Sequence, residues 1–387
     1  MVTEHSNTQR IGVIGGGQLA WMMAAGAKSL GVDLVVQTPK PDDPACSIAQ
    51  KTFLGPVADA NITKEMAADC DVITFENEFI DLPALRSLTQ TGITFYPQLD
   101  CLAPLLDKYD QRHYCSQIGL PSPTFKTLTD KTDLPTLKEK VKVVGLPLAL
   151  KTRRHGYDGQ GTFILKTLEA VETTWRDLGY QPVLLEAFVP FEKELAVMVA
   201  RDRSGTVAVY PVVETQQIDQ VCRRVIAPAR VAQSVVDEVR AIAQKLVNSL
   251  NVVGIFGIEL FLTSDGKVLI NEIAPRTHNS GHYTLDACVT SQFEQQLRAV
   301  SNRPLGSVEL TSPGAVMINL LGTEDAESDY ADKRAALAQI PNSQVYWYGK
   351  RQSRIGRKLG HVTILTDAST GSADLDSLIA SVERLWY

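Results

Sequence analysis

Two β-rich runs, Gly254-Ile-Phe-Gly-Ile-Glu-Leu-Phe-Leu262 and Lys267-Val-Leu-Ile-Asn-Glu-Ile273, flank the dipeptide Asp265-Gly266. An Asp-Gly dipeptide between apolar runs is a strong signal for a β-hairpin with a two-residue turn. In that register Glu259 stands directly opposite Glu272, with the two Cβ atoms about 5 Å apart. Two carboxylates this close are destabilising unless a proton or a hard cation bridges them, and Mg²⁺ favours carboxylates combined with phosphate oxygens. The hairpin therefore predicts a magnesium and nucleotide site with Glu259 and Glu272 as metal ligands.

The residues around this carboxylate pair are polar as well. Asn271 would add a neutral ligand or an amide that orients the metal. The following loop, Ala274-Pro-Arg-Thr-His-Asn-Ser-Gly-His282, is dense in hydrogen-bond donors, which is typical of a segment that grips a phosphorylated ligand. The alternative is a hairpin face exposed to solvent, on which water would stabilise both carboxylates.

A glycine-rich segment lies upstream of the hairpin. The apolar stretch Val143 to Leu150 ends in Lys151, and Gly156-Tyr-Asp-Gly-Gln-Gly161 precedes the apolar Thr162-Phe-Ile-Leu165. This order predicts a strand, a loop and a second strand. Glycines let backbone amides approach anionic oxygens, and a lysine adds a compact charge, so the segment suits a nucleoside triphosphate under a mobile hairpin. The alternative is a surface hairpin that uses its glycines only to turn, although Tyr157 and Asp158 weigh against it.

Further carboxylates follow this segment. The apolar run Pro182 to Val189 is expected to form a strand with Glu186 near its end, where a carboxylate can accept hydrogen bonds from ribose hydroxyls or an adenine amine. Alternation along the next strand places Glu192 and Glu194 on one face. Solvated carboxylates on an amphipathic strand are the alternative for that pair.

The N-terminal segment is expected to contain repeated βα units. Ile11 to Ile14 is a short apolar run, Gly15-Gly-Gly17 follows it, and an apolar-periodic stretch reaches Leu30 before Gly31, a plausible helix cap. Asp33 to Gln37 and Asp71 to Phe75 are further strand candidates, which indicates a parallel sheet. The glycines match a dinucleotide-binding fingerprint only in part, because the third glycine position holds Ala20 and no acidic residue ends the second strand.

Composition narrows the class of protein. The 387 residues are 44% hydrophobic and 21% charged, which is ordinary for a folded globular protein of two or three domains. The net charge of −6 argues against nucleic acid as the main partner. No apolar run reaches the length of a membrane helix and the start of the chain is polar, so a cytoplasmic location is expected, with six reduced cysteines.

A cationic stretch lies near the C-terminus. Trp347-Tyr-Gly-Lys350 is followed by Arg351, Arg354, Arg357, Lys358 and His361 within an otherwise acidic protein. Such a cluster is either a solvated face or a loop that attracts an anionic ligand.

These motifs together resemble the N5-carboxyaminoimidazole ribonucleotide synthetases, a family of the ATP-grasp superfamily. The specific string is Asn271-Glu-Ile-Ala-Pro-Arg-Thr-His-Asn-Ser-Gly-His282, and the resemblance runs from Gly15 to His361. It implies a mixed α/β and α+β protein with an ATP-grasp fold. The expected parts are an N-terminal Rossmann-like α/β domain at residues 1–105, an ATP-grasp domain at 106–310 with a lid at about 120–190, and a small C-terminal domain at 311–387.

The resemblance also implies a reaction. ATP, bicarbonate and 5-aminoimidazole ribonucleotide would give N5-carboxyaminoimidazole ribonucleotide, ADP and phosphate through carboxyphosphate, in the de novo biosynthesis of the purine nucleotide IMP. ATP and Mg²⁺ are the implied cofactors. The family further implies a cytoplasmic homodimer whose product passes to a separate mutase. An alternative is another ATP-grasp ligase, such as formate-dependent glycinamide ribonucleotide transformylase or biotin carboxylase, although the Trp347 to His361 stretch favours the first reaction.

The matching motif positions imply roles for individual residues. The implied catalytic residues are Asp158, Arg276 and Lys350. The implied ATP contacts are Lys108, Lys151, Gly156, Tyr157, Asp158, Gly159, Gln160, Gly161, Glu186, Ala187, Phe188, Val189, Glu194, Gln217, Asn271 and Glu272. The implied contacts with 5-aminoimidazole ribonucleotide and bicarbonate are Glu76, Tyr157, Asp158, Arg276, His278, Asn279, Ser280, Lys350 and Arg357.

The chain departs from the family pattern at a few of these positions. His155 stands where the lid usually has glycine, Gln160 where a basic residue is common, and Thr215-Gln-Gln217 where Asn-x-His is typical. Ala20-Trp21 replaces the usual Gly-Arg, which leaves Gln18 as a weaker candidate. Two readings from other classes, a nicotinamide-dependent oxidoreductase and a non-catalytic nucleotide sensor, are disfavoured by the partial fingerprint and by the Glu259 and Glu272 pair.

Overall fold

The parallel N-terminal sheet contains the three strands that the apolar runs predict and a fourth, β3, that was not predicted. The computed structural model describes residues 8–154 and 161–387. The strands pair in the order β3-β2-β1-β4, all parallel, and Gly31 ends its helix with a φ of 61°. The elements are β1 (Arg10–Ile14), α1 (Gln18–Trp21), α2 (Ala24–Leu30), β2 (Asp33–Thr38), η1 (Pro44–Ser47), β3 (Lys51–Leu54), α3 (Ala60–Ala67), β4 (Val72–Phe75), α4 (Leu82–Thr89), α5 (Leu99–Leu102) and η2 (Ala103–Leu105).

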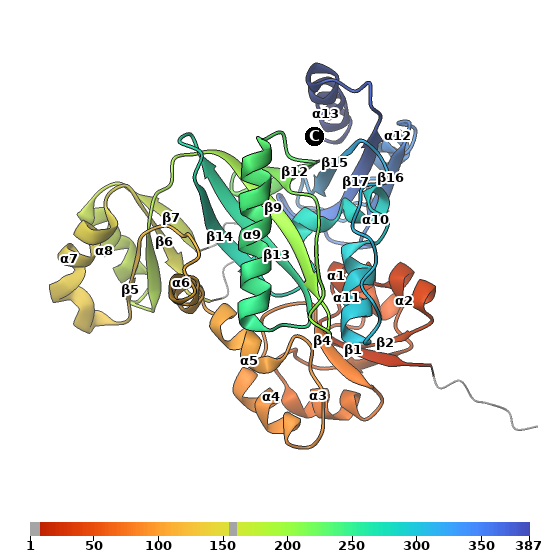
Figure 1. Cartoon of the computed structure of the whole chain (residues 1–387), viewed down its shortest axis with the longest axis horizontal. Coiled ribbons are helices and arrows are strands. Elements are labelled where there is room, and N and C mark those ends of the chain that lie inside the picture. The colour runs from red at the N-terminus through yellow and green to blue at the C-terminus, as the bar shows by residue number, and fades with distance from the viewer. Residues whose placement is uncertain (1–7, 155–160) are drawn as a thin grey trace, which may run out of the picture.

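A smaller antiparallel sheet of order β5-β8-β6-β7 follows and stands apart at one side of the molecule (Figure 1). The predicted strand from Val143 is wrong at its start, because residues up to Val144 end a helix. Leu137, Val141 and Val144 recur at helical spacing and are buried against the sheet, so helical burial decides this stretch. The elements are α6 (Lys108–Gln117), β5 (Phe125–Leu128), η3 (Lys131–Thr136), α7 (Leu137–Val144), β6 (Leu148–Thr152), β7 (Thr162–Leu165), α8 (Leu168–Asp177) and β8 (Val183–Ala187).

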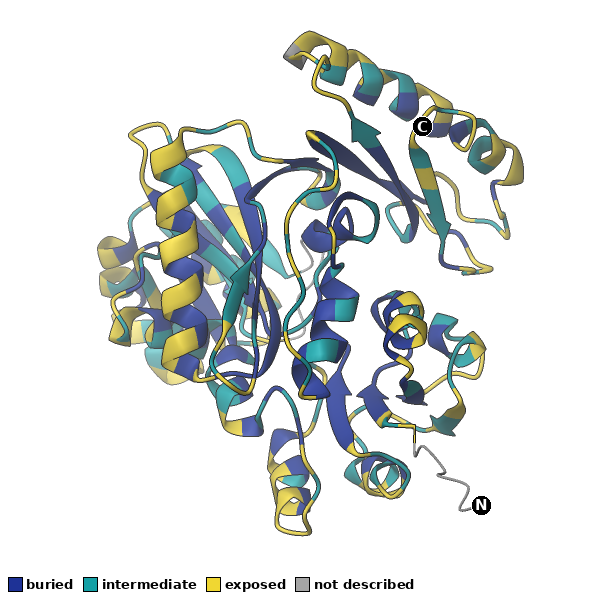
Figure 2. Cartoon of the chain, turned by 45° about the vertical axis from the view of Figure 1, so that its right-hand side comes forward, coloured by how far each residue is buried: buried dark blue, intermediate teal, exposed yellow. Residues whose placement is uncertain are grey.

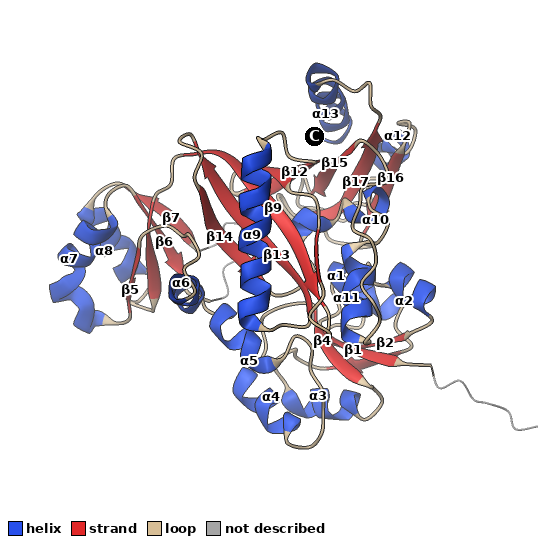
Figure 3. Ribbon diagram, viewed as in Figure 1, coloured by secondary structure: helices blue, strands red, loops and turns tan. Residues whose placement is uncertain are grey.

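A nine-stranded sheet forms the centre, in the order β14-β13-β9-β11-β12-β15-β17-β16 with β10 beside β9. Helix α9 lies across β9 and β13 (Figure 3), and one side of it is exposed (Figure 2) while the other packs into the core of the sheet. The elements are β9 (Phe191–Arg201), β10 (Val207–Val209), β11 (Val213–Ile218), β12 (Val221–Ala227), α9 (Gln233–Leu250), β13 (Gly254–Thr263), β14 (Val268–Ala274), η4 (Asn279–Gly281), α10 (Thr284–Ala287), α11 (Gln292–Val300), β15 (Gly314–Leu321), α12 (Ala331–Leu337), β16 (Ser343–Trp347), β17 (Lys358–Thr366) and α13 (Ser372–Trp386).

The β13-β14 hairpin confirms the predicted pairing of Glu259 with Glu272 but not the predicted two-residue turn. Thr263 N donates to Lys267 O, so three residues lie in the loop, and Gly266 adopts a φ of 82°. The longer loop shifts the pairing of the two strands by one residue, so that Leu260 pairs with Ile270. One residue further from the loop the predicted register returns, because Glu259 pairs with Glu272 and Asn271 is skipped. Asn271 is therefore the extra residue of a β-bulge, and the two irregularities together restore the predicted register.

The large sheet continues across the predicted boundary between residues 310 and 311. Strand β12 pairs with β15, whose residues Gly314–Leu321 belong to the predicted C-terminal part. We keep the division at residues 105 and 310, with a lid at about 120–190, as a proposal. In the described parts of the chain, no helix has the length and apolar character needed to cross a membrane.

Candidate functional site

A cavity of about 1020 Å³ lies where the three sheets meet. Lys151 and Glu186 reach it from the small sheet, Glu259 and Glu272 from the β13-β14 hairpin, and Glu76 from the segment after β4. The cavity thus collects residues separated by about two hundred positions in the sequence. A site that opens between sheets is a common location for a bound ligand.

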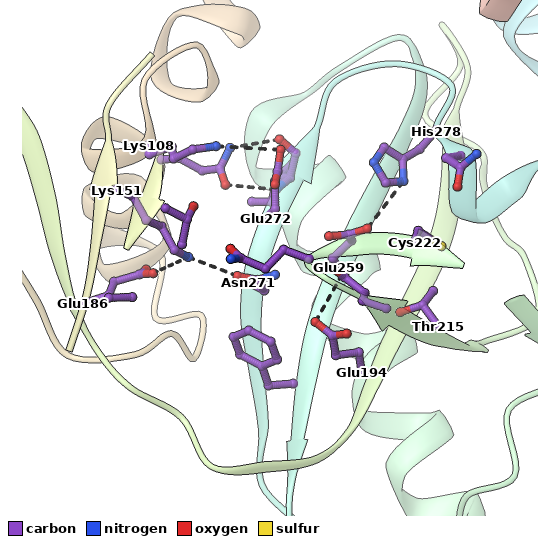
Figure 4. Close-up of a pocket in the computed structure, with 18 of the residues that line it drawn as sticks. Lys108, Lys151, Glu186, Glu194, Thr215, Cys222, Glu259, Asn271, Glu272 and His278 are labelled. Atoms are coloured by element: carbon purple, nitrogen blue, oxygen red, sulfur yellow. Dashed lines mark hydrogen bonds and ion pairs between the residues drawn. The ribbon is translucent and has the colours of Figure 1, made fainter. Parts of the chain in front are cut away.

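A buried group of charges forms the small-sheet side of the cavity. Lys151 Nζ lies 2.6 Å from Glu186 Oε2 and donates to Asn271 Oδ1 at 3.2 Å (Figure 4). Arg112 on α6 pairs with the other Glu186 oxygen and also donates to the backbone carbonyl of Asn271. Arg112 and Lys151 thereby tie β8 of the small sheet to β14 of the large one.

The pKa values in this group follow from burial opposed by ion pairing. Burial alone would raise the pKa of Glu186, but Arg112 and Lys151 outweigh it and lower that pKa to about 2. Burial dominates at Lys151 and lowers its pKa, in spite of the Glu186 carboxylate. Glu186 therefore remains a carboxylate, while Lys151 is a cation in a desolvated position that an anionic ligand would stabilise.

The paired carboxylates line the cavity on the side of the β13-β14 hairpin. Lys108 Nζ is 3.9 Å from Glu272 Oε1, and His278 Nδ1 is 3.9 Å from Glu259 Oε1 (Figure 4). Burial opposes ionisation of Glu272, but Lys108 and other nearby cations outweigh it and lower its pKa. Over residues 8–154 and 161–387, no cluster of three or more His, Cys, Asp or Glu side chains is arranged to hold a metal. Two carboxylates without further protein ligands fit Mg²⁺ that keeps phosphate oxygens and water as its remaining ligands.

Glu194 and an aromatic pair line the next part of the wall. Burial raises the pKa of Glu194 to about 7, against the opposing effect of Lys151. Gln217 Nε2 donates to Glu194 Oε1 at 3.3 Å. Phe191 and Phe261 stack face to face with ring centroids 4.8 Å apart and both line the cavity. Flat apolar rings beside a hydrogen-bonding carboxyl suit a heteroaromatic base and its ribose.

The opposite end of the cavity is held by the loop after β14. Arg276 Nε lies 2.9 Å from Glu78 Oε1. Burial raises the pKa of Glu76, although Arg276 and nearby backbone N–H groups favour its charged form. The amides of Asn279 and Asn319 exchange two hydrogen bonds of 2.9 and 2.8 Å, which fix the loop against β15. This end presents a guanidinium, an imidazole and amides to a ligand.

Most of the residues predicted for the site come together in this single cavity. Fifteen of them line it: Glu76, Lys108, Lys151, Glu186, Ala187, Phe188, Val189, Glu194, Gln217, Glu259, Asn271, Glu272, Arg276, His278 and Asn279.

The remaining predicted residues lie elsewhere or are not described. Ser280 is buried and shares a hydrogen bond of 2.6 Å with His278 Nδ1. Lys350 Nζ donates to the carbonyl of Lys358, Arg357 donates to that of Gln352, and neither side chain is part of the cavity wall. Gly161 precedes β7 with a φ of 79°. The residues Gly156, Tyr157, Asp158, Gly159 and Gln160, together with His155, lie outside the described residues.

Several cavity residues were missed by the sequence analysis. Gln111 and Arg112 share one face of α6 with Lys108. Their spacing of three and four residues from Lys108, which was predicted to contact ATP, could have identified them as cavity residues. Glu78 alternates with Glu76 and pairs with Arg276. The stacking of Phe191 on Phe261 had no local signal, because it depends on the pairing of β9 with β13.

The sequence matches three family models. The ATP-grasp domain matches residues 113–293, the ribonucleotide synthetase preATP-grasp domain matches residues 8–104, and the phosphoribosylaminoimidazole carboxylase C-terminal domain matches residues 315–373.

Individual relatives are similar over nearly the whole chain. The N5-carboxyaminoimidazole ribonucleotide synthase of Synechococcus elongatus is 52% identical over 384 residues, which cover 98% of this chain and 96% of that protein. A crystal structure of carboxyaminoimidazole ribonucleotide synthase from Aspergillus clavatus with ATP is similar at a TM-score of 0.89 and 30% identity, covering 98% of this chain and 99% of that one. A second crystal structure from that organism, in complex with ADP and 5-aminoimidazole ribonucleotide, has a TM-score of 0.88 and 29% identity and covers 98% and 100%.

Proposed function

The chain belongs to the N5-carboxyaminoimidazole ribonucleotide synthetases of the ATP-grasp superfamily. From the residues that line its cavity, we propose which of them bind each substrate and which act in the reaction. The protein is an ATP-dependent ligase of purine biosynthesis that carboxylates 5-aminoimidazole ribonucleotide. One observation carries the assignment of roles: the Lys151 and Glu186 pair, the Glu259 and Glu272 pair and the Arg276 loop share one cavity.

We assign the nucleotide to the side of the cavity next to the small sheet. Phe191 and Phe261 would pack against the adenine, and the segment Glu186 to Val189 would supply hydrogen-bonding groups for its edge. Glu194, held by Gln217, would accept from ribose hydroxyls. Lys151 and Lys108 would then stabilise the phosphates, because an anionic ligand favours the charged form of a lysine in a desolvated position.

The Glu259 and Glu272 pair would hold Mg²⁺, since like charges this close need a cation and no further described carboxylate or imidazole completes a protein cage. When bound, Mg²⁺ would neutralise charge that accumulates on the phosphates during transfer. Asn271, already an acceptor for Lys151, would keep its amide beside the same phosphates.

Bicarbonate is the proposed carboxyl source, because the reaction needs an oxygen nucleophile that ATP can activate. A bicarbonate oxygen would attack the γ-phosphorus, release ADP and form carboxyphosphate. The exocyclic amine of 5-aminoimidazole ribonucleotide would then attack the carboxyl carbon and expel phosphate. Arg276, His278 and Asn279 line the end of the cavity where these anions would meet. We keep Asp158 as the proposed proton acceptor for the amine, and Lys350, Arg357 and Ser280 as proposed substrate contacts.

Oxygen-18 transfer tests this chemistry. With ¹⁸O-labelled bicarbonate, and in reactions faster than its exchange with water, phosphate released in the presence of 5-aminoimidazole ribonucleotide should carry one labelled oxygen. Unlabelled phosphate would contradict the activation of bicarbonate by ATP.

The assembly and location remain predictions. The resemblance predicts a homodimer, a cytoplasmic location and transfer of the product to a separate mutase. Sedimentation of the purified protein over a range of concentrations tests the first of these.

A further inference from the structure

Gln292, the first residue of α11, grips the backbone of His278 through both ends of its amide. Its Oε1 accepts from His278 N at 2.9 Å and its Nε2 donates to His278 O at 2.8 Å. A backbone N–H can only donate and a backbone carbonyl can only accept. The orientation of the Gln292 amide is therefore decided by its partners.

The second N–H of the Gln292 amide is available to His282, the next histidine along the loop. Gln292 Nε2 lies 3.2 Å from His282 Nδ1, and Gln292 is fully buried. Because the amide nitrogen can only donate, Nδ1 of His282 must accept, and the neutral ring then carries its proton on Nε2. Burial lowers the pKa of His282 well below its usual range, with nearby cations acting in the same direction, so the ring stays neutral.

The ring of His282 lines the cavity with limited freedom to move. It packs against the rings of Phe293 and His361, with centroid distances of 5.7 and 5.0 Å. Arg276 and Lys358, which also line the cavity, are close enough to influence its ionisation. An N–H donor near two cations suits an anionic oxygen.

We propose that Gln292 is a positioning residue that holds His282 as an Nε2–H donor, and that His282 donates this hydrogen bond to an anionic oxygen of the bound substrate. The inference rests on the proposed function, which supplies two such anions, the phosphate of 5-aminoimidazole ribonucleotide and the carboxylate derived from bicarbonate. The Gln292 and His282 pair thus contributes to the affinity for 5-aminoimidazole ribonucleotide or for bicarbonate, and not to the affinity for ATP.

Gln292→Glu tests the positioning role. A carboxylate can still accept from His278 N but can donate neither to His278 O nor to His282 Nδ1. In ¹⁵N-histidine NMR of the free protein, His282 should change from the Nε2–H form to an Nδ1–H or doubly protonated form. The KM for one of the two anions should rise by about tenfold or more, the usual effect of losing a hydrogen bond to a charged group, while the KM for ATP stays within about twofold.

The chain supplies a matched control one helical turn away. Gln295 grips Gly306 in the same manner, with bonds of 2.9 and 2.8 Å, but does not line the cavity. Gln295→Glu removes an equivalent buried hydrogen bond and should leave all three KM values unchanged. Comparing the two variants separates positioning of His282 from loss of stability.

A second pair of variants tests the donor itself and does not depend on folding of Gln292→Glu. The amide of His282→Gln reaches the position of the histidine Nε2, whereas the amide of His282→Asn reaches only that of Nδ1. We expect the glutamine variant to retain most of the affinity for the anion and the asparagine variant to lose it. If the asparagine variant has a higher KM for the ribonucleotide, the acceptor is the phosphate of that substrate. If it has a higher KM for bicarbonate, the acceptor is the carboxylate.

The inference is overturned if His282 is not in the Nε2–H form in the free protein, or if Gln292→Glu and His282→Asn leave both anion KM values unchanged. Failure of the proposed function looks different, because the wild-type protein would then consume no 5-aminoimidazole ribonucleotide. The NMR measurement would still report the tautomer in that case.

Discussion

Glu259 and Glu272 are direct partners across β13 and β14, although the turn between these strands is longer than the two-residue turn that their register requires. The bulge at Asn271 corrects the register and has a second effect. In a regular strand, consecutive side chains point to opposite faces, but here Asn271 and Glu272 both line the cavity. The bulge therefore places an amide for Lys151 and a carboxylate for a cation on the same side of one strand.

The paired carboxylates predict the effect of Glu272→Gln. This change removes one negative charge from the proposed Mg²⁺ site while keeping shape, so the fold should be little affected. Turnover should fall by about 100-fold or more, since losing even an outer partner of a metal ligand costs about 10- to 100-fold. The measurement is steady-state ADP release as Mg²⁺ is varied, with Glu238→Gln on the exposed face of α9 as control. Wild-type turnover and Mg²⁺ dependence would refute the metal assignment.

Arg112 predicts a stability effect that a surface arginine does not have. Its side chain and that of Glu186 are only 3% and 2% exposed, so Arg112→Met leaves the carboxylate with Lys151 alone. We expect a loss of about 3 kcal/mol in the free energy of unfolding, because breaking a buried ion pair strands a charge. Urea denaturation measures it, with Arg176→Met at the exposed pair with Asp177 as the control. Equal losses in the two variants would show that burial of the pair is unimportant.

Glu194 predicts a pH dependence of stability. Its pKa is about 7 in the folded protein against an ordinary value of 4.5, so it contributes stability below about pH 4.5 that is lost as the pH rises through about 7. Glu194→Gln removes this contribution. The difference in Tm between wild type and variant, both without nucleotide, should therefore fall steadily between about pH 5 and pH 8. A difference that is constant over this interval would contradict a raised pKa at Glu194.

The position of Lys151 predicts that its loss affects the KM for ATP and the KM for 5-aminoimidazole ribonucleotide differently. It lies between Glu186 and Asn271 on the side that we assign to ATP, so Lys151→Met should raise the KM for ATP by about tenfold or more by removing a charged contact. The KM for 5-aminoimidazole ribonucleotide should change little, because its proposed contacts lie at the other end of the cavity. Lys166→Met, on an exposed position after β7, is the control for loss of a lysine. A larger effect on the ribonucleotide than on ATP would reverse our assignment of the two ends.

The sequence allowed prediction where local pattern and burial agree. The parallel strands β1, β2 and β4 were predicted correctly because a short apolar run bounded by turn residues typically forms a buried strand. The Glu259 and Glu272 pair was predicted through an incorrect turn, because the longer turn and the bulge compensate each other. The end of α7 was misread, because adjacent valines are typical of a strand, whereas here Val144 is buried at helical spacing from Val141 and Val143 is exposed.

Tertiary contacts account for most of what could not be predicted. Arg112 reaches Glu186 and Asn271 only because α6 packs between the small sheet and β14. The clamp of Gln292 on His278 likewise depends on α11 lying beside the loop after β14. The side chains of Lys350 and Arg357 donate to backbone carbonyls near β17. The motif that suggested their roles gives no indication of these contacts.

Coupled turnover tests the central claim most directly. ADP release from the purified protein with Mg-ATP and bicarbonate should be strongly stimulated by 5-aminoimidazole ribonucleotide, and the loss of that nucleotide should match the ADP formed. ADP release that is indifferent to the ribonucleotide, with none of it consumed, would contradict the account.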